Sequence, residues 1–63
     1  MNDEIYTIEK YSKDRLAWIK VSNRYTKELA ITEMDSKFFR QSLERISYRV
    51  RQGDRIIAQR LVV

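Results

Sequence analysis

The absence of both cysteine and histidine from a chain of only 63 residues does most to restrict how that chain can fold. No disulfide can form, and a structural zinc ion lacks its usual ligands, so the two common devices that stabilise very small domains are missing. A domain of this size buries only about 60% of the surface that its unfolded chain exposes. We therefore expect a single domain over residues 1–63, held by a compact apolar core that self-association would enlarge.

The first half of the chain has the composition of β-strands. Ile5–Tyr11 and Leu16–Val21 are rich in β-branched and aromatic residues, and the polar residues between them indicate a turn. The Ser-Asn pair that follows offers a second reversal, after which the alternating segment Tyr25–Ile31 predicts a third strand. Apolar residues across Ile5–Ile19 also fit helical spacing, so an N-terminal helix remains the alternative.

One amphipathic helix is predicted over about 36–46. Asp35 or Ser36 is a suitable N-cap for it. Apolar residues then follow at intervals of four, three and four, the spacing that lines one helix face. They are Phe39, Leu43, Ile46 and Val50. Phe39 is therefore expected in the core, with Phe38 at the edge of the core or exposed.

A β-hairpin is predicted over about 47–62. Its turn signal is Gly53 followed by Asp54, which suits a two-residue turn of type II′. Unbroken pairing outward from this turn gives one largely apolar face and one basic face, which carries Arg49, Arg51 and Arg60. The alternative extends the preceding helix to position 51 and ends it at Gly53.

These elements together predict an α+β fold, in which antiparallel strands pack on one amphipathic helix and a hairpin closes the chain. A helix followed by a basic hairpin is also the layout of winged helix-turn-helix proteins. With an N-terminal helix in place of the first strands, that architecture is the alternative.

The positive charge of the chain is concentrated in its C-terminal part. Residues 1–36 carry six basic and seven acidic side chains, whereas residues 37–63 carry seven basic and two acidic ones. The formal net charge of +4 therefore comes from a segment at +5 and a segment at −1. Six of the seven C-terminal cations are arginine, whose planar fork can bind a phosphate with two parallel hydrogen bonds.

This asymmetry predicts a small regulatory protein that binds nucleic acid, DNA more than RNA, by attachment to the phosphate backbone. Any reading of bases would fall to residues of the predicted helix. The candidate nucleic-acid-binding residues are Lys37, Arg40, Gln41, Arg45, Arg49, Arg51, Arg55 and Arg60. The bland interpretation is that these charges form an ordinary solvated surface.

A protein-binding module, such as a small regulator or inhibitor of a larger protein, is the alternative function. Arg and Tyr are favoured at interface hot spots. The apolar end Leu61–Val63 has no charged residue to protect it, so a C-terminal strand there would present an open sheet edge. The same edge predicts a homodimer.

Catalysis, cofactor binding and a metal site have no support in the sequence. There is no histidine for acid and base chemistry near neutral pH, no cysteine nucleophile and no glycine-rich phosphate loop. No apolar run approaches the roughly 20 residues that span a bilayer, and the acidic N-terminus differs from a secretory signal. We expect a cytoplasmic protein without enzymatic activity and without a membrane partner.

Overall fold

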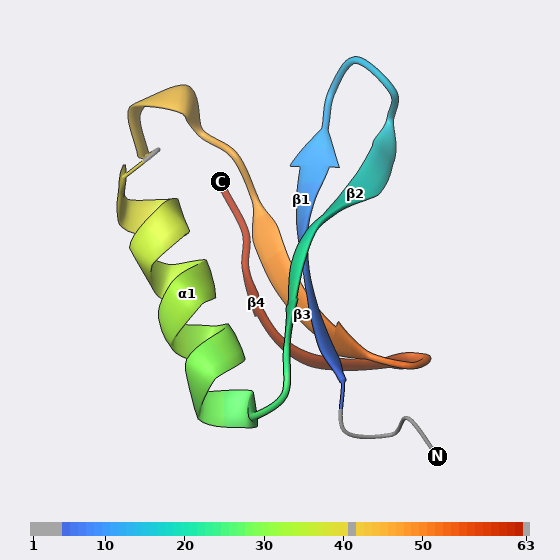
Figure 1. Ribbon diagram of the computed structural model, residues 1–63. Helices are drawn as coiled ribbons and strands as arrows, with labels where there is room; N and C mark the ends of the chain where they lie inside the picture. Colours follow the sequence, from blue (N-terminus) through green and yellow to red (C-terminus); the bar gives the residue numbers. More distant parts are fainter. Residues whose placement is uncertain (1–4, 41, 63) are drawn as a thin grey trace.

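The computed structural model describes residues 5–40 and 42–62 as a four-stranded antiparallel sheet with one helix on one face (Figure 1). The elements in chain order are β1 (Tyr6–Ser12), β2 (Ala17–Arg24), α1 (Lys27–Arg40), the short 3₁₀ helix η1 (Ser42–Glu44), β3 (Tyr48–Gln52) and β4 (Arg55–Arg60). The strand order is β2-β1-β3-β4, so the first strand of the chain lies in the middle of the sheet. The predicted α+β class is confirmed.

The core lies between α1 and one face of the sheet. Ile8, Tyr48 and Val50 enter it from β1 and β3, and Ala30 and Met34 enter it from α1. All five are at most 2% exposed. Since β1 and β3 are neighbours, these few side chains form one contact layer across the centre of the sheet.

The N-terminal strands and the C-terminal hairpin are confirmed. β1 and β2 correspond to the first two predicted strands, and the Ser12 hydroxyl accepts a hydrogen bond from the Arg15 backbone N–H in the turn between them. The reversal predicted at Ser22 and Asn23 is wrong, because β2 continues through both residues to Arg24. Gly53 has a φ of +59°, and Asp54 has no positive φ, which is the pattern of a type II′ turn. The N-terminal helix, and with it the winged helix-turn-helix alternative, is wrong because residues 6–24 are occupied by this first hairpin.

The predicted third strand and the predicted bounds of the helix are wrong. Tyr25–Ile31 does not form a strand, because α1 begins at Lys27. Thr26 caps it: its hydroxyl accepts a hydrogen bond from the Leu29 backbone N–H at 3.2 Å. The helix ends at Arg40, so the alternative that extends it to position 51 is wrong as well.

With α1 at Lys27–Arg40, two residues of the predicted apolar helix face are exposed to solvent. Phe39 is 76% exposed and Leu43 is 97% exposed. Helical spacing from Met34 brings Phe38 against the core instead. Beyond η1 the backbone turns at Arg45, whose φ is +56°, and the chain then enters β3.

The position of the helix cap supplies a first test. Thr26→Ala is expected to lower the free energy of unfolding by about 1 kcal/mol, because the Leu29 N–H loses its partner in the first turn. Ser36→Ala changes the residue that was predicted as the cap but lies exposed inside α1, so it should leave stability unchanged or raise it by about 0.3 kcal/mol. Urea denaturation followed by circular dichroism measures both, and a larger loss for Ser36→Ala would contradict this helix start.

Candidate nucleic-acid interface

The face of the sheet opposite α1 carries a continuous set of polar and aromatic side chains. Strand alternation places Ile8 and Val50 toward the helix and therefore Glu9, Arg49 and Arg51 on the opposite side. Direct cross-strand pairing adds residues from the two edge strands to this side. The open face, as we define it, comprises Thr7, Glu9, Tyr11, Trp18, Lys20, Asn23, Arg49, Arg51, Ile56 and Gln59.

Glu9 lies at the centre of the open face and holds two arginines. Its Oε1 accepts a hydrogen bond from Arg49 Nε at 2.6 Å, and its Oε2 accepts one from Arg51 Nη2 at 2.9 Å. The residue is only 5% exposed, although it lies on the uncovered side of the sheet. The side chains of the two arginines therefore shield the carboxylate from water.

These contacts decide the protonation state of Glu9. Burial alone raises the pKa of the carboxyl group, but the hydrogen bonds and positive charges of Arg51 and Arg49 together outweigh burial. The pKa of Glu9 is therefore lowered from its ordinary value of 4.5. The same contact raises the pKa of Arg51, so both partners keep their charge near neutral pH.

Arg49 also makes a cation–π contact. The carbon of its guanidinium group lies 4.3 Å from the centroid of the Trp18 ring. Tyr11 packs against the same indole in an edge arrangement, with ring centroids 5.4 Å apart and an interplanar angle of 71°. The open face thus presents an aromatic pair next to a guanidinium group that the Glu9 carboxylate fixes in place.

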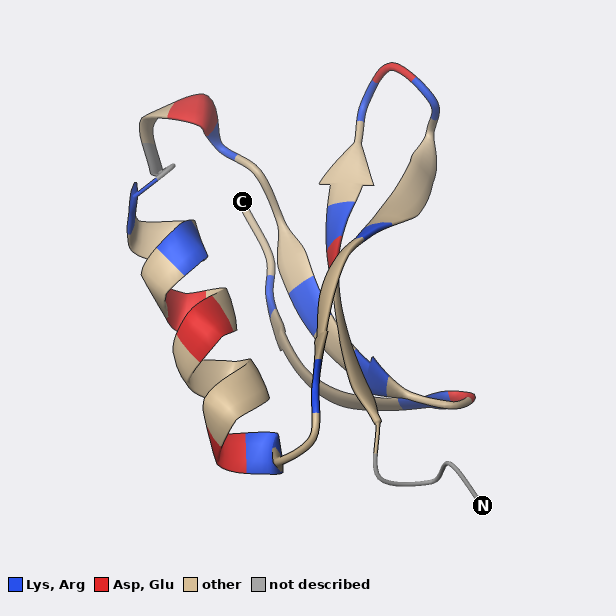
Figure 2. Ribbon diagram, viewed as in Figure 1, with Lys and Arg blue, Asp and Glu red and all other residues tan. Residues whose placement is uncertain are grey.

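The predicted cluster of eight basic and polar residues does not assemble at one site (Figure 2). Arg49 and Arg51 share the open face, with Arg55 at the start of β4 beside the hairpin turn. Arg60 faces the helix and binds Asp35, with 2.9 Å between Nε and Oδ1. Lys37 lies on α1, 3.9 Å from Glu33.

Three members of the predicted set remain. Arg40 lies at the end of α1, and Arg45 lies in the connection to β3. Gln41 lies outside the described residues. The acids that pair with other basic members of the set are Glu9, Glu33 and Asp35, which all lie within residues 1–36. Much of the charge excess of residues 37–63 is therefore neutralised internally.

A β-bulge explains why Arg60 leaves the predicted basic face. Pairing follows the prediction at the turn, where Arg51 lies opposite Ile56. The register then shifts, so that Val50 pairs with Ala58 and Tyr48 pairs with Arg60. One extra residue in β4 reverses the side to which all later side chains point.

Glu9, Tyr11, Trp18 and Lys20 are members of the open face that the sequence prediction missed. A usable signal was present for Glu9, because a carboxylate next to the apolar Ile8 needs a cationic partner when the strand is central and buried. Lys20 has no such signal, since an exposed lysine is ordinary at any surface. Its place opposite Glu9 depends on the strand register alone.

The described part of the chain has neither a cluster of metal-binding side chains nor a helix that could span a membrane. Within residues 5–40 and 42–62, no three acidic side chains gather closely enough to hold a metal ion. Over the same ranges, α1 and η1 are too short and too polar to cross a bilayer. No family model, curated protein or solved structure matches this chain.

Proposed function

We propose that this chain is a small nucleic-acid-binding regulatory protein that holds a single strand against the open face of its sheet. The observation that carries the proposal is the Arg49 guanidinium, which Glu9 holds over the indole of Trp18. Proteins that bind single strands combine cationic groups that follow the phosphates with aromatic groups on which bases stack. Both kinds of group lie side by side here.

The charges on the open face support the binding of phosphates. Lys20, Arg49 and Arg51 give three positive charges against the single negative charge of Glu9. Each guanidinium group has five N–H donors, and the bonds to Glu9 and to the Gly53 carbonyl leave some of them free on both arginines. Because these arginines are already held in place, binding a phosphate costs them little conformational entropy.

A single strand fits this surface better than a duplex. Base reading in a duplex requires an element that enters a groove, which was the role expected of residues in the predicted helix. Lys37 lies instead beside Glu33 on α1, on the opposite side of the sheet from the open face. The preference for DNA over RNA stays a prediction, since stacking and phosphate contacts are common to both polymers.

The single tryptophan of the chain makes the proposal directly testable. Oligothymidylate of about 12 nucleotides is expected to quench Trp18 fluorescence on binding, because a base would stack beside the indole. On a log-log plot, the binding constant should fall with salt with a slope of about −0.7 for each phosphate neutralised. Lys20→Gln should weaken binding about threefold to fivefold and flatten the slope by about 0.7.

Arg40→Gln serves as the matched control, since it removes the same charge from the exposed end of α1. It should leave the salt slope within about 0.2 of the original value, as expected for a charge outside the contact. No quenching and no binding at low salt would overturn the proposal. Equal effects of Lys20→Gln and Arg40→Gln would show that only the net charge attracts the polymer.

The protein-binding module remains the second candidate function, and exposed apolar side chains favour it. Phe39, Leu43 and Leu61 are 76%, 97% and 53% exposed. They belong to the end of α1, to η1 and to the segment after β4, which lie toward the same end of the molecule (Figure 1). Failure of the oligonucleotide titration would leave this function as the better supported one.

The homodimer and the cytoplasmic location stay predictions. β4 does lie at an edge of the sheet, but it ends at Arg60, so Leu61 and Val62 lie beyond the strand and Val63 lies outside the described residues. The bulge of β4 next to Ile57 also interrupts the regular ladder, and bulged edges resist pairing with another strand. We therefore propose the single chain as the unit that binds nucleic acid.

A further inference from the structure

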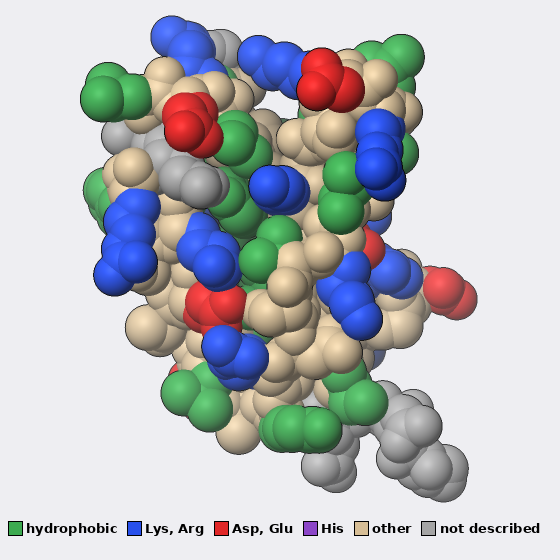
Figure 3. Space-filling model, turned by 45° about the horizontal axis from the view of Figure 1, so that its top comes forward, with side chains coloured by type: hydrophobic (Ala, Val, Ile, Leu, Met, Phe, Trp, Pro, Cys, Tyr) green, Lys and Arg blue, Asp and Glu red, His purple; other side chains and the backbone are tan. Residues whose placement is uncertain are grey.

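A cavity of about 550 Å³ opens beyond the end of the sheet nearest the C-terminus. The β1–β2 hairpin forms one wall, and the connection from η1 to β3 forms the other. The floor is the last contact between these parts, where the Tyr11 N–H donates to the Ser47 carbonyl at 3.0 Å. Figure 3 shows the molecule hollowed at this end, with basic and acidic side chains around the opening.

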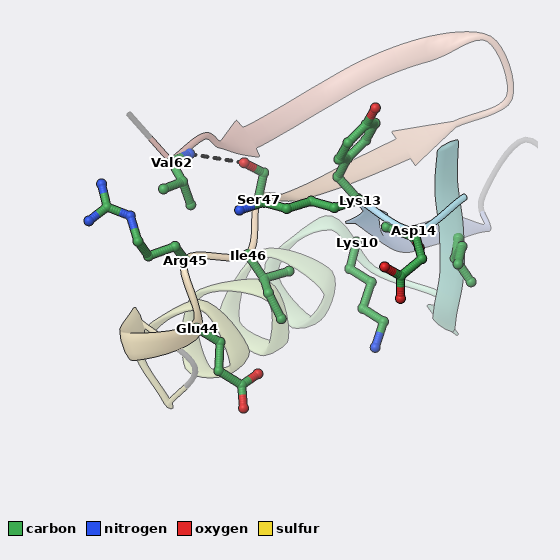
Figure 4. Close-up of a pocket in the computed structure, with 11 residues that line it drawn as sticks. Lys10, Lys13, Asp14, Glu44, Arg45, Ile46, Ser47 and Val62 are labelled. Atoms are coloured by element: carbon green, nitrogen blue, oxygen red, sulfur yellow. Dashed lines mark hydrogen bonds between the residues drawn. The ribbon is translucent and has the colours of Figure 1, made fainter. Parts of the chain in front are cut away.

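Two of the cations that line the cavity, both lysines, have no partner in the described part of the chain. Lys10 and Lys13 come from the end of β1 and the following turn, and neither ammonium group makes a hydrogen bond or an ion pair there. Figure 4 shows the Lys13 side chain extending from its turn toward the opposite wall. Apolar side chains of Ile19, Ile46 and Val62 complete the lining between the charged groups.

Charge and volume together restrict what the cavity can hold. The three basic side chains Lys10, Lys13 and Arg45 outnumber the two acidic ones, Asp14 and Glu44. The volume falls in the usual range for small-molecule sites. A compact anion is therefore favoured, whereas a run of several phosphates would face the two carboxylates as well as the lysines.

The cavity and the open face have one residue in common. Tyr11 lines the cavity and also packs against Trp18 on the open face. A single-stranded nucleic acid that lies on the open face and passes Tyr11 would bring its terminal nucleotide to the cavity. A terminal phosphate carries about −1.5 to −2 charges near pH 7, more than the single charge of an internal phosphodiester.

We propose that this cavity binds the terminal phosphate of the single strand held on the open face, with Lys10 and Lys13 as the groups that bind it. The proposal rests on the proposed function of the open face. It assigns to the protein a preference for strand ends that carry a phosphate over those that carry a hydroxyl group. Lysine suits this role because its ammonium group acts as a compact point charge toward phosphate.

The test compares three oligothymidylates of equal length that carry a 5′-phosphate, a 3′-phosphate or hydroxyl groups at both ends. One of the two phosphorylated strands is expected to bind about fivefold more tightly than the hydroxyl strand. The double variant Lys10→Gln/Lys13→Gln should abolish that advantage and leave the binding of the hydroxyl strand nearly unchanged. Lys27→Gln, at the far end of α1, is the matched control and should preserve the advantage.

The outcomes separate the two proposals. Equal affinity for all three strands would overturn the role of the cavity and leave the open face as a binding surface. An advantage that survives in the double lysine variant would also overturn it, since the phosphate would then bind elsewhere. If none of the three strands binds, both proposals are wrong.

Discussion

Met34→Ala is expected to lower the free energy of unfolding by about 3 kcal/mol, which is a large share of the total stability of so small a domain. Met34 is fully buried in α1 against Ile8 and Val50, so its truncation removes apolar contact and leaves a cavity that the surrounding residues cannot close. A domain of this size has a free energy of unfolding of about 3–9 kcal/mol. Urea denaturation at 25 °C measures the loss.

Phe39→Ala is the matched control, because it removes a larger side chain from the same helix. Phe39 is 76% exposed, so its truncation should change stability by no more than about 0.5 kcal/mol. The two variants also separate the helix described here from the one predicted over about 36–46, in which Phe39 is a core residue. A greater loss for Phe39→Ala than for Met34→Ala would contradict the observed packing.

The second large effect is expected for Glu9→Gln, at about 2 kcal/mol. The substitution keeps the size of the side chain but removes the charge that binds Arg49 and Arg51. Hydrogen bonds to charged groups contribute about 1.5–3 kcal/mol each. The expected loss is smaller than the sum for two such bonds, because the two arginine side chains are 21% and 36% exposed and regain contact with water when the charge is removed.

Glu9 also predicts the direction of the pH dependence. Its pKa is lower in the folded protein than the ordinary value of 4.5, so folding favours the ionised form. The stabilisation is fully present above about pH 4.5 and is lost as the pH falls through the lower folded value. Urea midpoints measured from pH 7 down to pH 3 should therefore decline less steeply for Glu9→Gln than for the unmodified protein.

Glu28→Gln provides the comparison for both measurements. Glu28 is an exposed carboxylate in the first turn of α1, where the helix dipole favours a negative charge. Its loss should cost about 0.5 kcal/mol or less. If Glu28→Gln and Glu9→Gln prove equally mild, the carboxylate at the centre of the open face does not stabilise the fold as proposed.

The strands and the hairpin could be predicted because their signals are local. β-branched and aromatic residues mark β1 and β2, and Gly53 with Asp54 marks the turn of the last hairpin. The helix could not be placed by the same means, because two spacings compete. Asp35 with Phe39 and Leu43 fits a helix that begins late, and Thr26 with Ala30 and Met34 fits one that begins early.

Distant contacts decide between these two spacings. Ala30 and Met34 find partners in Ile8 and Val50, on strands that lie far from α1 in the sequence. Tertiary packing of this kind routinely overrides local propensity. The interactions of the open face could not be predicted from local sequence for the same reason, since Glu9 and Arg49 are separated by 40 positions.

The register of β4 limited the prediction of the site. The turn at Gly53 predicts the first residue pairs of the hairpin correctly. The residues around Ile57 contain no sequence signal for the bulge that follows. Because side chains alternate along a strand, one inserted residue places Arg60 on the helix side of the sheet, where it binds Asp35. Arg60 is thereby separated from Arg49 and Arg51, with which it was predicted to share a face.

The central position of β1 has a consequence for the way the protein is made. β1 is synthesised before α1, yet one of its two neighbours in the sheet is β3, which is synthesised after α1. Until that late segment emerges, Ile8 lacks Val50 and the nascent chain has no complete core. A chain that is truncated before β3 therefore consists of a hairpin and a helix whose apolar side chains lack the core partners that β3 supplies, and such exposed apolar surface favours aggregation.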